Sequence, residues 1–396
     1  MRYIISMSRK NNVKKSDTTS GAEKKYKSKW WLWLIGLVLC AGTLILAFFL
    51  NNQYEGNVDG SPLIDLKDYE ITKGGSYSLS GDYQCVKIRV SDDVKLILDG
   101  ASITCGNGPA IYVENAKVVE VVLRGSNIVS ATTTDALEGV IHSTDDLIFS
   151  GEGTLTIPGN LDGIVSKDTL TIKSGTYNIT TGDDCIKARD SVVINSGAFN
   201  LISADGDAIK ATNNEDSKLG YIVIKDGDFN IQAGQDGIQS ETYTTIYDGK
   251  LTIAVGDDGI HATTKLEING GEIAINGREG LEATYVLIND GKIKIEAMDD
   301  GINAGEKSKE LAVGVEVNGG EITIDMGASD TDAVDSNGFL KITGGTFDIT
   351  AQSPFDYDGT LTYSGGTIIV NGVTVNKVTN QFAGDGGGGP VMPGRR

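Results

Sequence analysis

A repeat of about 22 residues is the feature of this sequence that most restricts its fold. Glycines separate short β-type runs between residues 153 and 366, and six of the nine intervals between these glycines are 20 to 22 residues. They are Gly153, Gly175, Gly197, Gly227, Gly249, Gly271, Gly291, Gly320, Gly345 and Gly366. A unit of this length cannot enclose a hydrophobic core alone, so successive units must stack to bury their apolar residues. The repeat therefore predicts a solenoid.

The units consist of strands. Apolar residues alternate with other residues, as in Leu155/Ile157 and Val192/Ile194, which is the period of a strand with one buried face. A β-sandwich would show variable spacing, and the calcium-binding β-roll has a nine-residue period and a Gly-Gly-x-Gly-x-Asp signature that is absent here. We therefore predict an all-β chain, a right-handed parallel β-helix over residues 63–376. The longer intervals predict loops near 212–219 and 305–312.

The N-terminal 50 residues predict a membrane anchor. Residues 1–29 hold nine Lys or Arg and two acids, and residues 30–50 hold no charge. The uncharged run is long enough to span a bilayer, and the basic flank predicts a cytoplasmic N-terminus. We expect a basic cytoplasmic tail (1–29), a transmembrane signal anchor (30–50), a linker (51–62), an extracellular domain at the cell surface and a Gly-rich tail (377–396). The alternative, a cleaved signal peptide, is disfavoured because no small-residue cleavage site follows the run.

The net charge restricts which partners the protein can bind. It is −20, and residues 1–29 contribute +7, so the remainder carries −27. Such a surface repels nucleic acid and attracts cations. Cys85 and Cys105 lie 20 residues apart and either pair across neighbouring coils or remain free thiols.

Every repeat carries an acid two residues before a buried apolar anchor, as in the stretch "GDDGIHA" at residues 256–262. These acids are Asp162, Asp184, Asp207, Asp236, Asp258, Glu279, Asp300 and Asp332. In a parallel stack, equivalent residues lie ~4.8 Å apart, and two carboxylates at that distance repel by roughly 3–4 kcal/mol at an effective dielectric constant of ~20. Protonation, cationic neighbours such as Arg278, Lys187 and Lys210, or a bound metal would relieve this repulsion.

Ca²⁺ is the most economical of these solutions, since it takes six to eight oxygen ligands. Only two histidines and no cysteine cluster are present, which disfavours zinc. The predicted metal ligands are Asp183, Asp184, Asp205, Asp207, Asp236, Asp257, Asp258, Asp299 and Asp300. The alternative is that these aspartates only cap Asp-Gly turns.

A second column follows the apolar anchors. Strand alternation points these residues outward, which predicts a ligand-binding strip beside the acids. Its candidate binding residues are Lys187, Lys210, Gln239, His261, Glu282 and Asn303. A merely solvated face is the alternative.

The 22-residue repeat, the "GDDGI-x-A" units and the glycine-separated strands resemble the extracellular carbohydrate-binding, polysaccharide-lyase-like β-helix proteins of cell-wall-degrading bacteria, with a pectate-lyase-like fold, over roughly residues 63–376. The resemblance implies a right-handed parallel β-helix and binding of plant-wall polysaccharides such as pectic acid or cellulose. It also implies calcium between the coils, held by Asp183, Asp184, Asp205, Asp207, Asp236, Asp257 and Asp258.

Catalysis is the main alternative to simple binding. In a calcium-dependent lyase, Lys187 or Lys210 would be the base, but neighbouring carboxylates raise a lysine pKa and favour a salt bridge. "GDDCIKA" resembles the polygalacturonase Asp-Asp motif, yet the Gly-His-Gly, Asn-Thr-Asp and Arg-x-Lys elements of that family are missing. We therefore predict a monomeric, non-catalytic ectodomain that binds polysaccharide, either an acidic, pectin-like chain held through calcium or cellulose. A pectate lyase and an adhesin-like surface rod are the alternatives.

Exposed aromatic side chains would favour sugar binding over a purely structural role. The candidates are Tyr221, Tyr243, Tyr247, Tyr285, Phe355 and Tyr357. A set this sparse favours an anionic polysaccharide over a crystalline neutral glucan.

Overall fold

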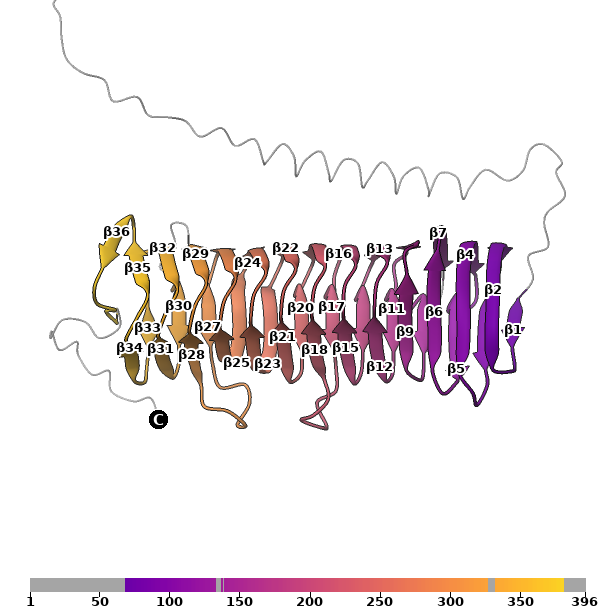
Figure 1. Cartoon of the computed structure of the whole chain (residues 1–396), viewed down its shortest axis with the longest axis horizontal. Helices are drawn as coiled ribbons and strands as arrows, with labels where there is room; N and C mark the ends of the chain where they lie inside the picture. The colour runs from indigo at the N-terminus through magenta and orange to yellow at the C-terminus, as the bar shows by residue number, and fades with distance from the viewer. Residues whose placement is uncertain (1–67, 133–136, 138, 327–331, 381–396) are drawn as a thin grey trace, which may run out of the picture. The chain divides into compact units, whose positions relative to one another are not determined.

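The structure, a computed structural model, describes residues 68–132, 137, 139–326 and 332–380. These residues form 36 strands and no helix, wound into about 13 turns of about 22 residues (Figure 1). The predicted all-β parallel solenoid is therefore confirmed. The predicted tail at 1–29, anchor at 30–50 and linker at 51–62 lie outside the described residues. Within the described part, no helix has the length and apolar character needed to cross a membrane.

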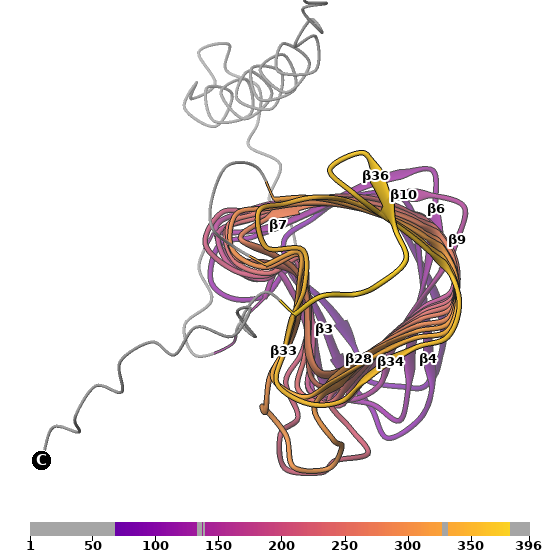
Figure 2. The same ribbon diagram turned by 90° about the vertical axis from the view of Figure 1, so that its left-hand side faces the viewer.

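Each coil contributes to three faces, which we number in chain order (Figure 2). The first face consists of short strands: β1 (Tyr69–Ile71), β3 (Val86–Arg89), β5 (Ile111–Asn115), β8 (Ile141–Ser143), β11 (Ile164–Ser166), β14 (Ile186–Ala188), β17 (Ile209–Ala211), β20 (Ile238–Ser240), β27 (Ile302–Ala304), β30 (Val334–Ser336) and β33 (Asp356–Tyr357). The second face comprises β6 (Val119–Arg124), β9 (Leu147–Gly151), β12 (Thr169–Ile172), β15 (Ser191–Ile194), β18 (Tyr221–Ile224), β21 (Tyr243–Ile246), β28 (Gly314–Val317), β31 (Phe339–Ile342) and β34 (Leu361–Tyr363).

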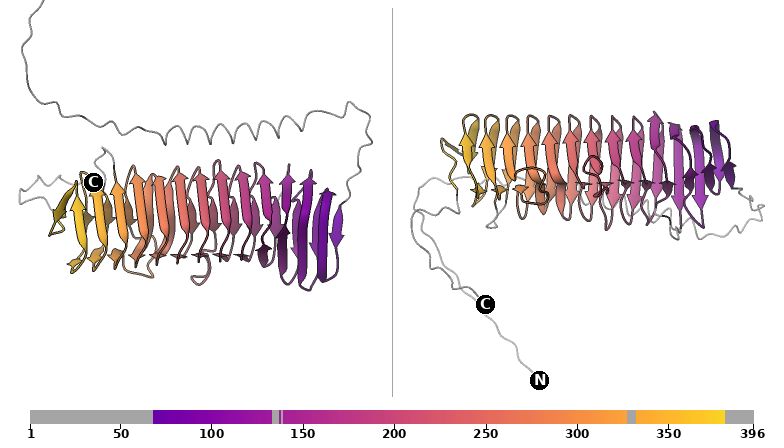
Figure 3. Two further views of the ribbon diagram at one scale, coloured as in Figure 1. Left: turned by 45° about the horizontal axis from the view of Figure 1, so that its top comes forward. Right: turned by 90° about the horizontal axis from the view of Figure 1, so that it is seen from below.

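The third face holds the longer strands of each coil. They are β7 (Ser126–Ala131), β10 (Thr154–Pro158), β13 (Thr176–Thr181), β16 (Ala198–Ser203), β19 (Asp228–Ala233), β22 (Lys250–Val255), β24 (Glu272–Gly277), β26 (Lys292–Ala297), β29 (Glu321–Asp325), β32 (Thr346–Thr350) and β35 (Thr367–Val370). Four strands turn a corner without a break: β2 (Gly75–Tyr83) and β4 (Val94–Cys105) join the second and third faces, and β23 (Asp258–Ile268) and β25 (Glu279–Ile288) join the first and second. Figure 3 shows the strands of successive coils side by side along the rod.

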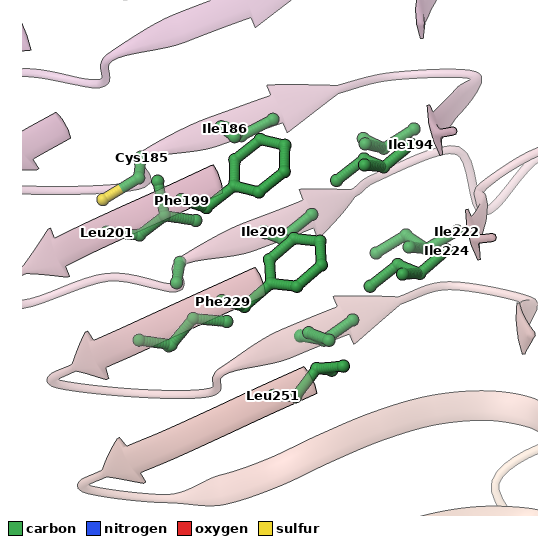
Figure 4. Packing of buried hydrophobic residues seen from close by; sticks show 14 of the residues in the cluster. Cys185, Ile186, Ile194, Phe199, Leu201, Ile209, Ile222, Ile224, Phe229 and Leu251 are labelled. Carbon is green, nitrogen blue, oxygen red and sulfur yellow. The ribbon is translucent and has the colours of Figure 1, made fainter. Parts of the chain in front are cut away.

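Inward-pointing side chains fill the solenoid in columns. The anchors Ile186 and Ile209 are fully buried, and Phe199 stacks on Phe229 with ring centroids 4.5 Å apart (Figure 4). Tyr177 continues this stack at 5.0 Å from Phe199. Like residues meet because parallel pairing keeps equivalent positions in register.

Glycine is required where the chain enters the third face. Gly227 has φ 144°, which L side chains rarely adopt, and a Cβ there would lie 2.7 Å from the Phe229 ring. The turn glycine thus leaves room for the stacked aromatic ring.

A disulfide, two loops and a terminal antiparallel strand depart from the regular coils. Cys85 and Cys105 form the disulfide between neighbouring coils, and Cys185 is a free, buried thiol. The two expected loops connect β17 to β18 and β27 to β28, and both leave the rod at the edge between the first and second faces (Figures 1 and 2). At the C-terminal end, β36 (Val373–Val375) turns back and pairs antiparallel with β35, whereas the other strand pairings in the described part are parallel.

Candidate functional site

The acids that precede the first-face anchors form what we call the acid ladder: Asp162, Asp184, Asp207, Asp236, Asp258, Glu279, Asp300 and Asp332. Four backbone bonds connect the first five acids of the ladder. From Asp184 to Asp258, the backbone N–H of each acid donates to the Oδ1 of the ladder acid one coil earlier. These distances are 3.0 Å for Asp184 to Asp162, 2.9 Å for Asp207 to Asp184, 2.8 Å for Asp236 to Asp207 and 2.9 Å for Asp258 to Asp236. One oxygen of Asp162, Asp184, Asp207 and Asp236 is therefore already used by the backbone of the next coil, whereas the sequence had suggested capping within the same turn.

The column that follows the anchors is continuous in register, but Glu282 is only 7% exposed and the other members are partly buried. Register places Lys187 beside Lys210, then Gln239, His261, Glu282 and Asn303, one residue per coil. The strip differs from one part to the next in how it compensates the buried acids.

In the lysine-paired segment (Asp162, Asp184, Asp207, Lys187 and Lys210), ammonium groups bridge successive acids. Lys187 Nζ lies 3.2 Å from Asp162 Oδ2 and 3.0 Å from Asp184 Oδ2. Lys210 Nζ lies 2.5 Å from Asp207 Oδ2 and 3.9 Å from Asp184 Oδ1. Burial opposes the charge of Lys210, but the hydrogen bond to Asp207 and the charge of Asp184 outweigh it and raise the pKa of Lys210. A lysine held protonated in this way is a poor general base.

Farther along, the same positions form the histidine cluster: Asp236, Asp258, His261, Glu279 and Glu282. His261 Nδ1 lies 3.6 Å from Asp236 Oδ2, 3.9 Å from Asp258 Oδ2 and 3.6 Å from Glu282 Oε2. Donor atoms of Asp236, Asp258 and His261 lie within 4.8 Å of one another, and so do those of Asp258, Glu279 and Glu282. No lysine of the column stands here, so several carboxylates face one another.

The crowding of buried carboxylates shifts their pKa values. Burial, followed by the hydrogen bond and charge of Glu282, raises the pKa of Asp258 to about 9. Burial works against the ionised form of Glu282 as well, but hydrogen bonds from Asp258 and Lys307 leave its pKa below the ordinary value. Asp258 and Glu282 therefore titrate as a pair that holds one shared proton between them. Burial and the charge of Asp335 likewise raise the pKa of Asp300 to about 7.

Cations border the histidine cluster on its outer side. Arg278 bonds Asp257 and lies 3.3 Å from Asp258 Oδ1, 2.8 Å from Glu279 Oε1 and 2.9 Å from Asp299 Oδ2. From the loop after β27, Lys307 Nζ lies 2.5 Å from Glu282 Oε1. The sequence signalled Arg278 by its place beside Glu279, but nothing in the repeat pattern signalled Lys307.

The predicted metal ligands fall into three kinds of position. Asp184, Asp207, Asp236 and Asp258 are buried in the ladder, Asp300 is partly buried, and Asp183, Asp205 and Asp299 are exposed. Among the described residues, the third three-donor group is Asp162, Asp183 and Asp184. Asp257 is partly buried. Five of the nine predicted ligands belong to none of the three groups: Asp205, Asp207, Asp257, Asp299 and Asp300.

A divalent cation fits one part of the strip better than the other. The histidine cluster offers carboxylate oxygens and a proton that a cation could replace, which is the donor chemistry that Ca²⁺ prefers. In the lysine-paired segment, ammonium groups already occupy the space between the carboxylates. Asp236, Asp258, Glu279 and Glu282 are therefore the residues best able to hold a cation.

The predicted aromatic candidates also separate. Phe355 is 1% exposed and belongs to the core, whereas Tyr247 is 53% exposed. Tyr221, Tyr243 and Tyr285 are partly exposed on one column of the second face.

Comparison with known proteins gives three matches. A family model described as carbohydrate-binding domain-containing protein matches residues 65–328 and 254–381. A curated carbohydrate-binding domain-containing protein from Acetivibrio thermocellus is 30% identical over 134 residues, which is 30% of this chain and 46% of that protein. The chain thus spans about half the length of this relative. A solved structure described as a polysaccharide lyase-like protein from C. thermocellum, gadolinium derivative, has 27% identity and a TM-score of 0.49, and the alignment covers 54% of this chain and 91% of that one.

Proposed function

The chain belongs to the family of carbohydrate-binding domain-containing proteins, and from that premise we propose that its first face binds an acidic polysaccharide without cleaving it. The observation that carries the proposal is the unbroken polar strip from Lys187 to Asn303, which presents one side chain per coil. Equivalent residues in a parallel stack repeat every ~4.8 Å, so the strip runs along the rod and suits a linear polymer.

Calcium is part of the proposal because the strip itself is acidic. A uronate chain approaching Glu282 or Asp258 meets like charge unless a cation lies between them. Asp236, Asp258, Glu279 and Glu282 would hold the cation, and exposed Asp299 and partly buried Asp300 would add oxygens nearby. Bound Ca²⁺ would supply positive charge to uronate carboxylates. Lys187 and Lys210 would add positive charge at one end of the strip, where they bridge Asp162, Asp184 and Asp207.

The disulfide supports an extracytoplasmic location for the solenoid. Structural disulfides such as Cys85–Cys105 persist in oxidising compartments. Together with the uncharged run at 30–50, this motivates the proposal of a single-pass protein with a cytoplasmic N-terminus and an extracellular rod at the cell surface. The monomeric state of the rod is part of the same proposal.

The binding test is retention of the full-length protein on immobilised polygalacturonate. We expect retention in calcium, loss of retention on chelation, and loss in the double variant Asp258→Asn/Glu282→Gln. Asp228→Asn, which changes an exposed acid on the third face, is the matched control and should bind normally. Equal retention with and without chelator would contradict the calcium proposal, and absence of retention in both would contradict acidic-polysaccharide binding.

A calcium-dependent lyase remains the second candidate, because Lys187 and Lys210 lie on the strip where a uronate would bind. Incubation with polygalacturonate and calcium, followed by absorbance of unsaturated product, separates the two functions. We expect no rise, since both lysines are engaged by carboxylates. A rise that Lys187→Ala or Lys210→Ala abolishes would establish the lyase instead. A rod with neither binding nor cleavage would have only the structural role that the acid ladder supports.

A further inference from the structure

We propose that the second face carries a separate carbohydrate-binding surface, an aromatic column that takes uncharged polysaccharide without a metal ion. This inference rests on the proposed carbohydrate-binding function, but it concerns another face of the rod. The aromatic column consists of Tyr221, Tyr243, Lys265, Tyr285, Gly314 and Phe339.

Strand register places these six residues in a single line along the rod. β18 pairs with β21 so that Tyr221 precedes Tyr243, which lies beside Lys265 in β23. Lys265 is in turn the partner of Tyr285. Tyr285 then pairs with Gly314, and Gly314 with Phe339. The line spans six successive coils. The sequence named Tyr221, Tyr243 and Tyr285 as separate candidates, and strand register brings them into one column.

The side chains of the column point outward. Each is followed by a buried residue that points into the core, such as Ile222 after Tyr221 or Val286 after Tyr285. The aromatic rings are partly exposed, as expected for rings that lean against the sheet. Part of this alignment stabilises the sheet itself, because aromatic rings on neighbouring strands pack against one another. The parts of the rings that stay exposed lie in one line, and such a line offers stacking surfaces to a ligand that runs along the rod.

Neighbouring groups fix the rings before any ligand arrives. The Tyr285 hydroxyl donates to Glu316 Oε2 at 2.9 Å, and the Tyr243 hydroxyl donates to Glu310 Oε2 at 2.9 Å, in the loop between β27 and β28. Gly314 provides room for Phe339, because a Cβ at that position would lie 2.4 Å from the ring. Phe339 therefore reaches across to Tyr285, with ring centroids 5.9 Å apart. Rings that are held in place lose less entropy on binding.

The chemistry of the column selects sugars of a particular kind. The faces of pyranose rings present C–H groups, which complement the negative faces of aromatic rings. Lys265 Nζ lies 2.8 Å from Glu267 Oε2, and Lys341 Nζ lies 2.9 Å from Glu316 Oε1, so the cations beside the column are already paired. Glu310 adds negative charge. A uronate chain gains nothing from this environment, whereas an uncharged chain can stack along it.

The polar strip of the first face and the aromatic column would then bind ligands of different charge. The polar strip requires a cation and binds uronates, whereas the aromatic column requires none and binds neutral chains. Scattered aromatic residues had favoured an anionic ligand alone, and their alignment on one face changes that expectation.

The test is affinity electrophoresis of the full-length protein in gels that contain hydroxyethyl cellulose, with EDTA present. We expect retardation of the wild type, and dissociation constants about threefold to tenfold higher for Tyr221→Ala and Tyr285→Ala. Tyr285→Phe keeps the ring and should bind as the wild type. Tyr247→Ala removes an exposed tyrosine outside the column and is the matched control. Thermal melts show whether each variant is folded, and Tyr221→Ala decides the matter if Tyr285→Ala does not fold.

The outcomes separate this inference from the proposed function. Calcium-dependent binding of polygalacturonate with no retardation by hydroxyethyl cellulose would overturn the aromatic column and leave the first face intact. Retardation that is equal in the wild type and the tyrosine variants would also overturn it. A dimer in gel filtration that Tyr221→Ala dissociates would show that a second copy covers the column, and would overturn it as well. Absence of binding to either polysaccharide would refute both proposals.

Discussion

The lysine-paired segment and the histidine cluster have the same backbone but opposite solutions to the same electrostatic problem. In both, a buried carboxylate accepts a backbone N–H from the next coil. Lys187 and Lys210 offset two of the three carboxylate charges in the first, where burial also raises the pKa of Asp162 and Asp207, whereas Asp258 and Glu282 share a proton in the second. The ladder position thus has a structural role from Asp162 to Asp258, and the residue that follows the anchor decides how the remaining charge is compensated.

The largest expected difference between the two regions is the effect of removing one acid. Asp207→Ala deletes the acceptor of the Asp236 N–H and the close partner of Lys210. We expect a loss of about 3–5 kcal/mol in the free energy of unfolding, measured in urea. Asp258→Asn replaces a protonated acid with an amide of similar shape and should cost less than about 1 kcal/mol without calcium. Equal losses would mean that the two regions are not electrostatically different.

Calcium should act on one region only. At a concentration one hundred times its dissociation constant, a ligand that binds only the folded state stabilises it by about 2.7 kcal/mol. We expect calcium to raise the melting temperature of the wild type and chelation to lower it. Lys187→Met should keep this response and Asp258→Asn/Glu282→Gln should lose it, as measured by calorimetry. An unchanged melting temperature on chelation of the wild type would rule out the cation site.

The pH dependence gives a smaller contrast. The pKa values of Asp258 (about 9) and Asp300 (about 7) lie above the ordinary value near 3.9, so the folded state binds more protons than the unfolded state between these limits. Stability without calcium should therefore fall as pH rises from about 5 to about 9, by on the order of 1–2 kcal/mol. The raised pKa of His261 acts in the same direction, because its stabilising charge is lost as pH rises through the folded-state value. Asp258→Asn should flatten the profile, and a steeper profile would contradict the assignment.

The smallest predicted change in the free energy of unfolding concerns the doublet Asp183–Asp184. Asp183 is exposed, whereas its neighbour Asp184 is 1% exposed and bonded to both the backbone and Lys187. We expect Asp183→Asn to change the free energy of unfolding by less than about 0.5 kcal/mol. A loss comparable to that of Asp207→Ala would show that the exposed column also belongs to the ladder.

The repeat alone predicted much of the fold and the alignment of the strip. Coil length, buried anchors such as Ile186 and Ile260, and the sequence Lys187, Lys210, Gln239, His261 along one face all follow from matching equivalent positions in successive units. These features depend only on period and register, which a single sequence contains.

Other parts of the site depend on geometry that the repeat does not encode. The carboxylate–amide bonds of the ladder require a particular turn shape, so the aspartates could not be assigned to backbone or metal from spacing. Lys307 and Glu310 reach their partners through the fold of an irregular loop. The pairing of Cys85 with Cys105 was open for the same reason, since separation along the chain left both outcomes possible.

The antiparallel β36 has a consequence for assembly. A stack of parallel coils has no intrinsic length, and its last rung offers unpaired N–H and C=O groups to any identical chain that arrives. By folding back on β35, residues 373–375 cover the third-face edge of the final coil with a strand of the opposite direction. Another coil could not continue the third face in register there. β36 thus limits end-to-end pairing on the third face, and deletion of residues 373–375 would expose the edge of β35 to another chain.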